Sequence, residues 1–156
     1  ARDLGGMIGA GGKSIRPHRL LRTAHLHDAT DADVARLKSE YNLCRIFDFR
    51  SIGESEAVPD RKIEGAQYHS LPTIDVRAEQ TTGKPIPEEA FLELDRHIVN
   101  YSFYPEVQMM AANMYPSLIR SEFSQLQYAA FLRLIIEAPE DGGILWHCAQ
   151  GKDRTG

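Results

Sequence analysis

The end of the chain carries a cysteine and an arginine at a spacing that suits phosphate chemistry. The segment reads Ile144-Leu145-Trp146-His147-Cys148-Ala149-Gln150-Gly151-Lys152-Asp153-Arg154-Thr155-Gly156. Five residues separate Cys148 from Arg154, and if they curl into a loop, several backbone N–H groups point inward and form an anion nest. Arg154 would add a bidentate fork for two phosphate oxygens, and a helix beginning near Arg154 would add its positive end. The spacing predicts a phosphate-binding loop.

The same loop would activate Cys148 as a nucleophile. The positive field that binds phosphate also stabilises a thiolate, which is the reactive form of cysteine. Gly151 lacks a Cβ at a point where the backbone must turn tightly or approach the ligand. A protease-like pair of Cys148 with His147 is excluded, because adjacent residues of a strand point to opposite faces. Cys44 lies in an apolar segment without cations on both sides, and we expect it in the core.

The run His147-Cys148-x-x-Gly151-x-x-Arg154-Thr155-Gly156 resembles the signature of the protein tyrosine phosphatase superfamily. The fuller run from Ala149 to Gly156 is similar to the branch that contains bacterial and fungal tyrosine and lipid phosphatases, some of which resemble phosphoinositide phosphatases. Three other segments are similar to the same branch: Arg2-Asp3-Leu4-Gly5-Gly6, Arg19-Leu20-Leu21-Arg22-Thr23-Ala24, and Phe47-Asp48-Phe49-Arg50-Ser51 with Glu54. The resemblance covers both ends of the chain, and residues 84–121 contribute little to it.

The resemblance implies a role for each residue of the loop. Cys148 would attack phosphorus and form a phosphocysteine, and Arg154 would hold the equatorial oxygens. His147 would position the loop through hydrogen bonds, and Thr155 would donate to the sulfur and help it leave in the second step. The phosphate-binding set would be Ala149, Gln150, Gly151, Lys152 and Arg154.

A carboxylic acid is needed to protonate the leaving oxygen, and two aspartates are candidates. Asp153 lies inside the loop, where related phosphatases are thought to carry their acid, and it is our first choice. Asp75 follows the second predicted strand, on a loop where many superfamily members carry theirs, and it is the alternative acid. Lys152 would add a second positive charge over the phosphate, which suits phosphoinositides as well as phosphotyrosine.

Composition limits the classes of partner. The net charge of −4 argues against nucleic-acid or anionic-membrane binding, and no apolar run reaches the roughly 18 residues of an integral membrane segment. Two cysteines do not suggest a disulfide framework, so we expect reduced thiols and a cytoplasmic location, with secretion as the alternative. No cofactor and no metal are expected, because His25 and His27 have no Cys/His cluster beside them. The oligomeric state is not indicated.

The elements that would position the loop follow from periodicity and capping signals. Apolar runs predict strands over 43–49, 66–71 and 144–147, and polar stretches predict loops over 53–65 and 77–87. Thr30 and Asp33 form a capping box for a helix over 31–41, which Asn42 would end, and Ser124 with Gln127 suggests a second box. Further helices are expected over 88–101 and 107–115. The glycine-rich first fifteen residues predict loop backbone, since Met7 and Ser14 break both nucleotide-binding templates.

This order of strands and helices predicts an α/β fold, a single phosphatase catalytic domain over residues 1–156 with a central sheet flanked by helices. The resemblance implies a tyrosine-phosphatase-like topology cut short at the C-terminal side, with its C-terminal helices missing. Phosphotyrosine, phosphoserine or phosphothreonine, and phosphoinositides are all open as substrates. A catalytically silent phosphate-binding module and a rhodanese-like sulfurtransferase are alternatives of other classes, although the latter does not account for Asp153 or Thr155.

Overall fold

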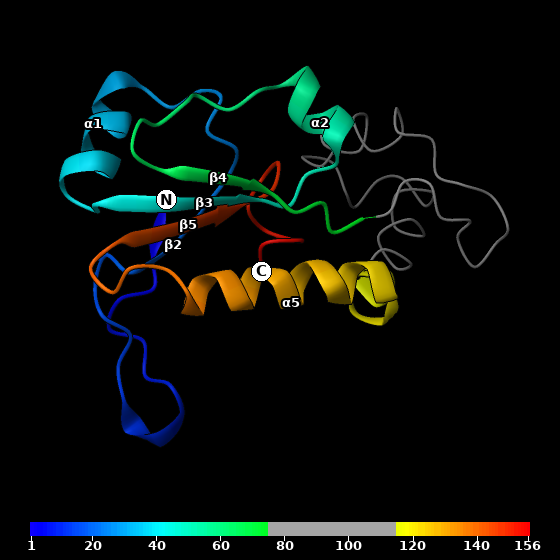
Figure 1. The fold of residues 1–156 in the computed structure, drawn as a ribbon, viewed down its shortest axis with the longest axis horizontal. Helices are drawn as coiled ribbons and strands as arrows, with labels where there is room; N and C mark the ends of the chain where they lie inside the picture. Colours follow the sequence, from blue (N-terminus) through cyan, green and yellow to red (C-terminus); the bar gives the residue numbers. More distant parts are fainter. Residues whose placement is uncertain (75–114) are drawn as a thin grey trace, which may run out of the picture.

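A computed structural model describes residues 1–74 and 115–156, which are built on a five-stranded sheet (Figure 1). The strand order is β1-β2-β5-β3-β4. β2, β5, β3 and β4 run parallel, and β1 joins the edge antiparallel to β2. The strands are β1 (Arg2–Asp3), β2 (Leu20–Thr23), β3 (Leu43–Asp48), β4 (Gln67–Ser70) and β5 (Gly143–His147). The predicted α/β fold with a central sheet is confirmed.

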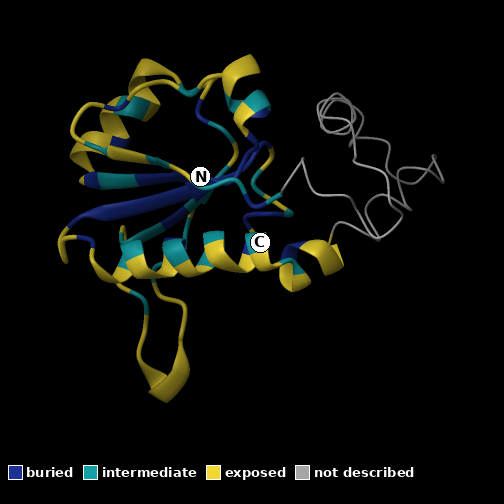
Figure 2. Cartoon of the chain, turned by 45° about the vertical axis from the view of Figure 1, so that its right-hand side comes forward, coloured by how far each residue is buried: buried dark blue, intermediate teal, exposed yellow. Residues whose placement is uncertain are grey.

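The central strand β5 is buried along its whole length (Figure 2). Its residues pair on one side with β2 and on the other with β3, so Leu145 lies between Leu21 and Ile46. A strand covered on both faces favours a continuous apolar run, which is what Ile144, Leu145 and Trp146 provide. The short apolar run that predicted this strand therefore reflects its position in the core.

Helices cover both faces of the sheet. α1 (Asp31–Ser39) and α2 (Ile52–Ala57) lie over one face, and α5 (Glu122–Ile136) lies along the other (Figure 1). Alternation along β5 divides the core, because successive side chains of a strand face opposite sides. One cluster comprises Leu21, Leu26, Leu37, Leu43, Ile46, Ile63 and Leu145. The second comprises Phe47, Phe49, Phe131, Ala138, Ile144, Trp146 and Cys148.

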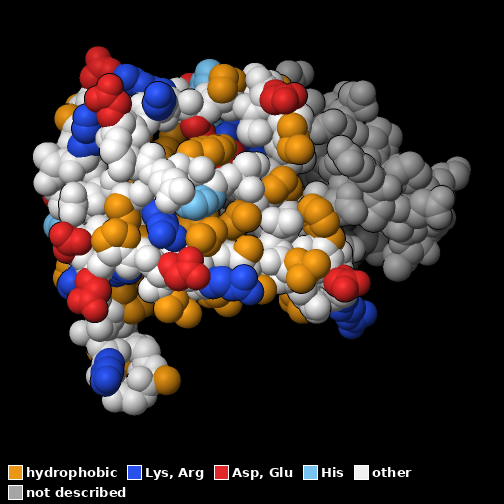
Figure 3. Space-filling view, in the orientation of Figure 1, with side chains coloured by type: hydrophobic (Ala, Val, Ile, Leu, Met, Phe, Trp, Pro, Cys, Tyr) orange, Lys and Arg blue, Asp and Glu red, His pale blue; other side chains and the backbone are white. Residues whose placement is uncertain are grey.

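Phe131 of α5 fixes the helix against the sheet. Its ring meets Phe47 and Phe49 edge-on, with both centroid distances 5.1 Å. Burying a phenylalanine side chain contributes about 1.5–3 kcal/mol, and edge-to-face pairs add to that. The outer side of α5 carries exposed apolar residues, among them Leu126 and Ile136 (Figure 3).

The capping signal at Thr30 predicted the start of α1 correctly. The Thr30 hydroxyl accepts from Asp33 N–H, and the Asp33 side chain accepts from Thr30 N–H. The helix ends at Ser39, and Asn42 then takes a positive φ of 45°. The predicted end of the helix was therefore two residues too late, and Asn42 lies beyond the cap at Glu40 in a left-handed conformation that asparagine tolerates better than most residues.

Three expectations about the elements were wrong. The segment predicted as a loop over 53–65 contains most of α2, whose capping box joins Ser51 and Glu54. α5 begins one turn earlier than expected, after Ser121, and Ser124 instead donates its hydroxyl to the Thr73 carbonyl. The short strands β1 and β2 were not predicted, and β1 lies within the segment read as loop.

Glycine-rich residues between β1 and β2 form an arm that extends away from the sheet (Figure 1). An isolated bridge joins Ile8 and Ser14 across the arm. The predicted loop over 77–87 and the helix over 88–101 fall outside the described residues, as does the helix over 107–115 apart from Tyr115. Within the described ranges, no helix is both long and apolar enough to cross a membrane.

Candidate active site

Three parallel strands deliver the candidate residues to one edge of the sheet. β3 and β5 end in register at Asp48 and His147, and β2 ends beside them at Thr23. The loop 148–156 follows β5, and the N-terminus of α2 follows β3. Ligands of parallel α/β sheets bind at the carboxyl ends of strands, and the predicted phosphate loop lies at such an edge.

Cys148 is buried at the start of the loop, with 3% of its surface exposed. The Gly151 N–H points back at the sulfur, and the distance from N to Sγ is 3.2 Å. Gly151 has a φ of 71°, a left-handed conformation in which a side chain is strained. The chain therefore curls over the sulfur and one backbone donor faces it, while phosphate binding by the loop stays a prediction.

Arg154 is held by a carboxylate of α2. Nη1 and Nη2 of Arg154 donate to the two oxygens of Glu54 at 2.6 and 2.7 Å, and both side chains are buried. The Ser51 N–H also donates to Glu54, at 2.7 Å. Burial alone would raise the pKa of Glu54, but its bonds with the Arg154 guanidinium outweigh burial and bring that pKa below its usual range. The pair thus stays ionised and fixes the plane of the guanidinium.

Lys152 and Asp153 lie at the outer side of the loop and form an ion pair with each other. The Lys152 side chain is 45% exposed and that of Asp153 is 15% exposed. The Tyr115 hydroxyl donates to the other Asp153 oxygen. Asp153 is therefore held by two donors near the mouth of the loop. The alternative acid, Asp75, lies outside the described residues.

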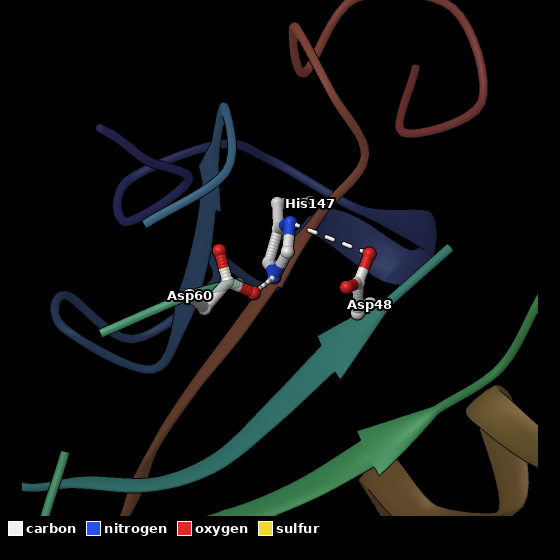
Figure 4. A group of neighbouring side chains, drawn as sticks. All are labelled: Asp48, Asp60 and His147. Atoms are coloured by element: carbon white, nitrogen blue, oxygen red, sulfur yellow. Dashed lines mark ion pairs between the residues drawn. The ribbon is translucent and has the colours of Figure 1, made fainter. Parts of the chain in front are cut away.

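His147 points into a buried charged cluster with Asp48 and Asp60 (Figure 4). Its Nε2 lies 3.1 Å from an oxygen of Asp60, and its Nδ1 lies 3.6 Å from Asp48 and 3.2 Å from the Cys148 carbonyl oxygen. Burial would raise the pKa of Asp60, but His147 and Arg50 together lower it. His147 thus contacts two carboxylates and the Cys148 carbonyl, and its positioning role in the loop stays a prediction.

Arg50 supplies the internal cation of this cluster. Its guanidinium donates to both oxygens of Asp48 at 2.7–3.0 Å and to Asp60 at 2.8 Å. The side chain is 1% exposed. Burial works against its charge, yet bonds to Asp48 raise the pKa of Arg50 above its usual value. The Tyr68 hydroxyl also donates to Asp48, and burial together with that bond raises the pKa of Tyr68.

Asp48, Asp60 and His147 have the ligand types of a metal site, with atoms that lie within 4.8 Å of one another. Arg50 already donates to both carboxylates, so these oxygens are neutralised by a side chain of the protein itself. A buried carboxylate needs a cationic or hydrogen-bonding partner, and Arg50 meets that need. The cluster is better explained as an internal ion-pair network than as a metal centre.

The other predicted loop residues divide into buried and exposed positions. Ala149 is buried and Gln150 is exposed. Thr155 is buried, and its carbonyl accepts from the Trp146 indole at 3.2 Å. Its hydroxyl has no hydrogen-bond partner within the described part of the chain, so the expected bond from Thr155 to the sulfur remains a prediction. Residues 153–156 form a turn closed by Gly156 N–H and the Asp153 carbonyl, not the expected first turn of a helix.

Sequence reasoning missed several residues that hold this site. Glu54, Asp48 and Arg50 belonged to a recognised segment, but no role was assigned to them. Asp48 and Arg50 could have been recognised, because they lie at the end of an apolar strand. Charged residues at a buried strand end must be paired. Asp60 and Tyr115 gave no comparable local signal.

Comparisons with known proteins agree with this geometry. A family described as "Tyrosine phosphatase family" matches residues 1–156. A protein of Cupriavidus necator named "Putative tyrosine-protein phosphatase" is 32% identical over 156 residues. The match covers 100% of this chain and 50% of that relative, so the chain spans half the relative's length.

Proposed function

The chain belongs to the tyrosine phosphatase family, and from that premise we propose that it hydrolyses phosphate monoesters through a phosphocysteine on Cys148. The observation that carries the proposal is the Gly151 N–H, which faces the Cys148 sulfur at 3.2 Å in a loop closed by Arg154. A donor aimed at sulfur favours the thiolate, and the same donor favours an anionic phosphoryl group there.

In the first step, the Cys148 sulfur forms a bond to phosphorus while the bond from phosphorus to the ester oxygen breaks. Asp153 gives its proton to the departing oxygen, so an alcohol or phenol leaves. In the second step, a water oxygen attacks the phosphocysteine and the sulfur–phosphorus bond breaks. Asp153 takes the proton of that water, inorganic phosphate leaves, and the Cys148 thiolate is restored. Arg154, oriented by Glu54, holds the equatorial oxygens in both steps.

Phosphotyrosine is the substrate class that the family supports best, and phosphoserine, phosphothreonine and phosphoinositides are the alternatives. The ion pair of Lys152 with Asp153 places a cation at the outer side of the loop, where further phosphate groups of a substrate would lie. A nucleophilic thiol works only when reduced, which the cytoplasm maintains. We therefore propose a cytoplasmic location for the protein.

The decisive experiment traps the intermediate. The chain is mixed with an aryl phosphate, quenched in acid and digested, and the peptide that contains Cys148 is weighed for one added phosphoryl group. Cys148→Ser should abolish both turnover and the added mass while retaining tungstate binding, because a serine alkoxide does not form at neutral pH.

Cys44 provides the matched control. It is the other cysteine of the chain, and burial raises the pKa of its thiol. Cys44→Ser should leave turnover and the trapped mass unchanged. Tungstate binding without turnover in the unmodified chain would support the silent phosphate-binding module instead.

A further inference from the structure

The phosphate loop works only if its N–H groups point inward, and the direction of each N–H is tied to a carbonyl. In a trans peptide, the carbonyl of one residue and the N–H of the next point in opposite directions. A donor that holds a loop carbonyl on the outer side therefore turns the next N–H toward the centre. The donors behind the loop decide its shape.

Two carbonyls of the loop are held by residues of β2 and the segment that follows it. The His25 N–H donates to the Ala149 carbonyl at 3.1 Å. Nη2 of Arg22 donates to the Gly151 carbonyl at 3.2 Å. The first contact orients the N–H of Gln150, and the second orients the N–H of Lys152.

The loop is fitted closely to this segment at Gly151. A Cβ at that position would clash with the backbone of Thr23 and Ala24. A Cβ at Gly156 would lie 3.2 Å from Nη2 of Arg22. Nη2 of Arg22 thus lies close to both glycines of the loop, so a shift of this guanidinium would move the loop.

We infer that Arg22 is a positioning residue of the phosphate site, and this inference rests on the proposed function. By holding the Gly151 carbonyl outward, Arg22 aims the Lys152 N–H into the loop. It also keeps the Gly151 residue in place, and the N–H of the same residue faces the Cys148 sulfur. Its positive charge adds to the field that stabilises the thiolate and the bound phosphate.

The buried Nε of the half-buried Arg22 supports a role beyond packing. Its Nε is buried without a hydrogen-bond partner within the described part of the chain, and an unsatisfied buried donor costs stability. Arg22 lies beside Trp146 in the β2–β5 register. An apolar residue at position 22 would pack there at a lower cost in stability. Other loop carbonyls are held by uncharged donors, Tyr128 on Arg154 and Trp146 on Thr155. Arg22 differs from them because it brings a charge.

The test compares Arg22→Met with Arg45→Met. Arg45 is a matched control, since its guanidinium also donates to a backbone carbonyl, that of Leu134 on α5 at 2.6 Å. Two quantities are measured: tungstate affinity by calorimetry, and the midpoint of the pH–rate profile for alkylation of Cys148 by iodoacetamide. Arg22→Met should weaken tungstate binding about tenfold and move the midpoint to higher pH, because a charge-assisted hydrogen bond is lost.

Arg45→Met should change neither quantity while lowering the melting temperature. Arg22→Lys keeps the charge and one donor, so it should fold and give an affinity between those of the wild type and Arg22→Met. Unchanged tungstate affinity and alkylation midpoint in Arg22→Met, or in Arg22→Lys if the first variant does not fold, would make Arg22 a packing residue and overturn the inference. Tungstate binding by a wild-type chain without turnover would refute the proposed function alone, and the Arg22 comparison would still decide the inference.

Discussion

Replacing Glu54 by glutamine tests the link between α2 and the phosphate loop. Glu54 accepts two bonds from Arg154 and one from the Ser51 N–H, and it is 4% exposed. Glu54→Gln keeps the size of the side chain but removes its charge and one acceptor. The Arg154 guanidinium would then lose its ion pair with the Glu54 carboxylate.

Breaking a buried ion pair from one side costs about 3–5 kcal/mol of the free energy of unfolding. Glutamine still offers one oxygen to Arg154, so we expect a loss at the lower end, about 3 kcal/mol. A guanidinium that is held less firmly by Glu54 also misaligns the phosphoryl group, and displacements of that kind cost about 10²-fold in rate. Both stability and kcat/KM should therefore fall together.

The lowered pKa of Glu54 also predicts how its contribution to the free energy of unfolding changes with pH. Because the pKa of Glu54 is lowered in the folded protein, its contribution to stability is complete above the unfolded value of about 4.3. It is lost as the pH falls through the folded value. The difference in unfolding free energy between wild type and Glu54→Gln should accordingly be largest near neutral pH and shrink in acid.

Urea denaturation at pH 7 and at pH 4 measures these differences, and an aryl phosphate assay measures kcat/KM. Asp33→Asn is the matched control, because Asp33 closes the same kind of capping box with Thr30 at an exposed helix start. If Glu54→Gln costs no more stability than Asp33→Asn and leaves kcat/KM unchanged, the pair does not position Arg154 and the reasoning fails.

Two further substitutions test the acid and the outer cation. Asp153→Asn should slow a substrate with a poor leaving group by about 10²–10⁴-fold and an activated aryl phosphate far less; that pattern in Asp75→Asn, with none in Asp153→Asn, would reassign the acid. Lys152→Ala should reduce turnover of multiply phosphorylated lipids more than that of phosphotyrosine peptides, because the more anionic ligand loses more attraction. Lys38→Ala is the control, since Lys38 is equally exposed and also paired with a carboxylate. Equal losses on both substrates would remove the argument for lipid preference.

The parts of the site that follow one another in the chain were predictable from the sequence. β5 and its loop are one continuous segment, in which an apolar run, a cysteine and an arginine occur at fixed spacing. The capping box of α1 is likewise local, because Thr30 and Asp33 are three positions apart. Such signals need no knowledge of tertiary structure.

The partners of those residues were not predictable in the same way. Glu54 lies 100 positions before Arg154, and Arg22 lies 129 positions before Gly151. Neither local segment indicates which distant residue it will contact. That contact depends on which residues are buried together, and this follows from the order of the strands in the sheet. α2 was missed for a related reason. Its six residues bury little apolar surface, so a periodicity argument had little to detect.

Two arginines at this edge, Arg154 and Arg50, are ion-paired before any ligand arrives, so more of the phosphate binding falls to the backbone. Arg154 lies against Glu54, and Arg50 lies against Asp48 and Asp60. A paired cation attracts a further anion less than an unpaired one, because the two opposite charges largely cancel beyond their separation. The N–H groups of the loop carry no such counter-charge. We therefore expect the ion pairs to orient the arginine side chains and the backbone N–H groups to supply most of the affinity for phosphate. A substitution that tilts the loop should then weaken phosphate binding more than its change in charge alone would predict.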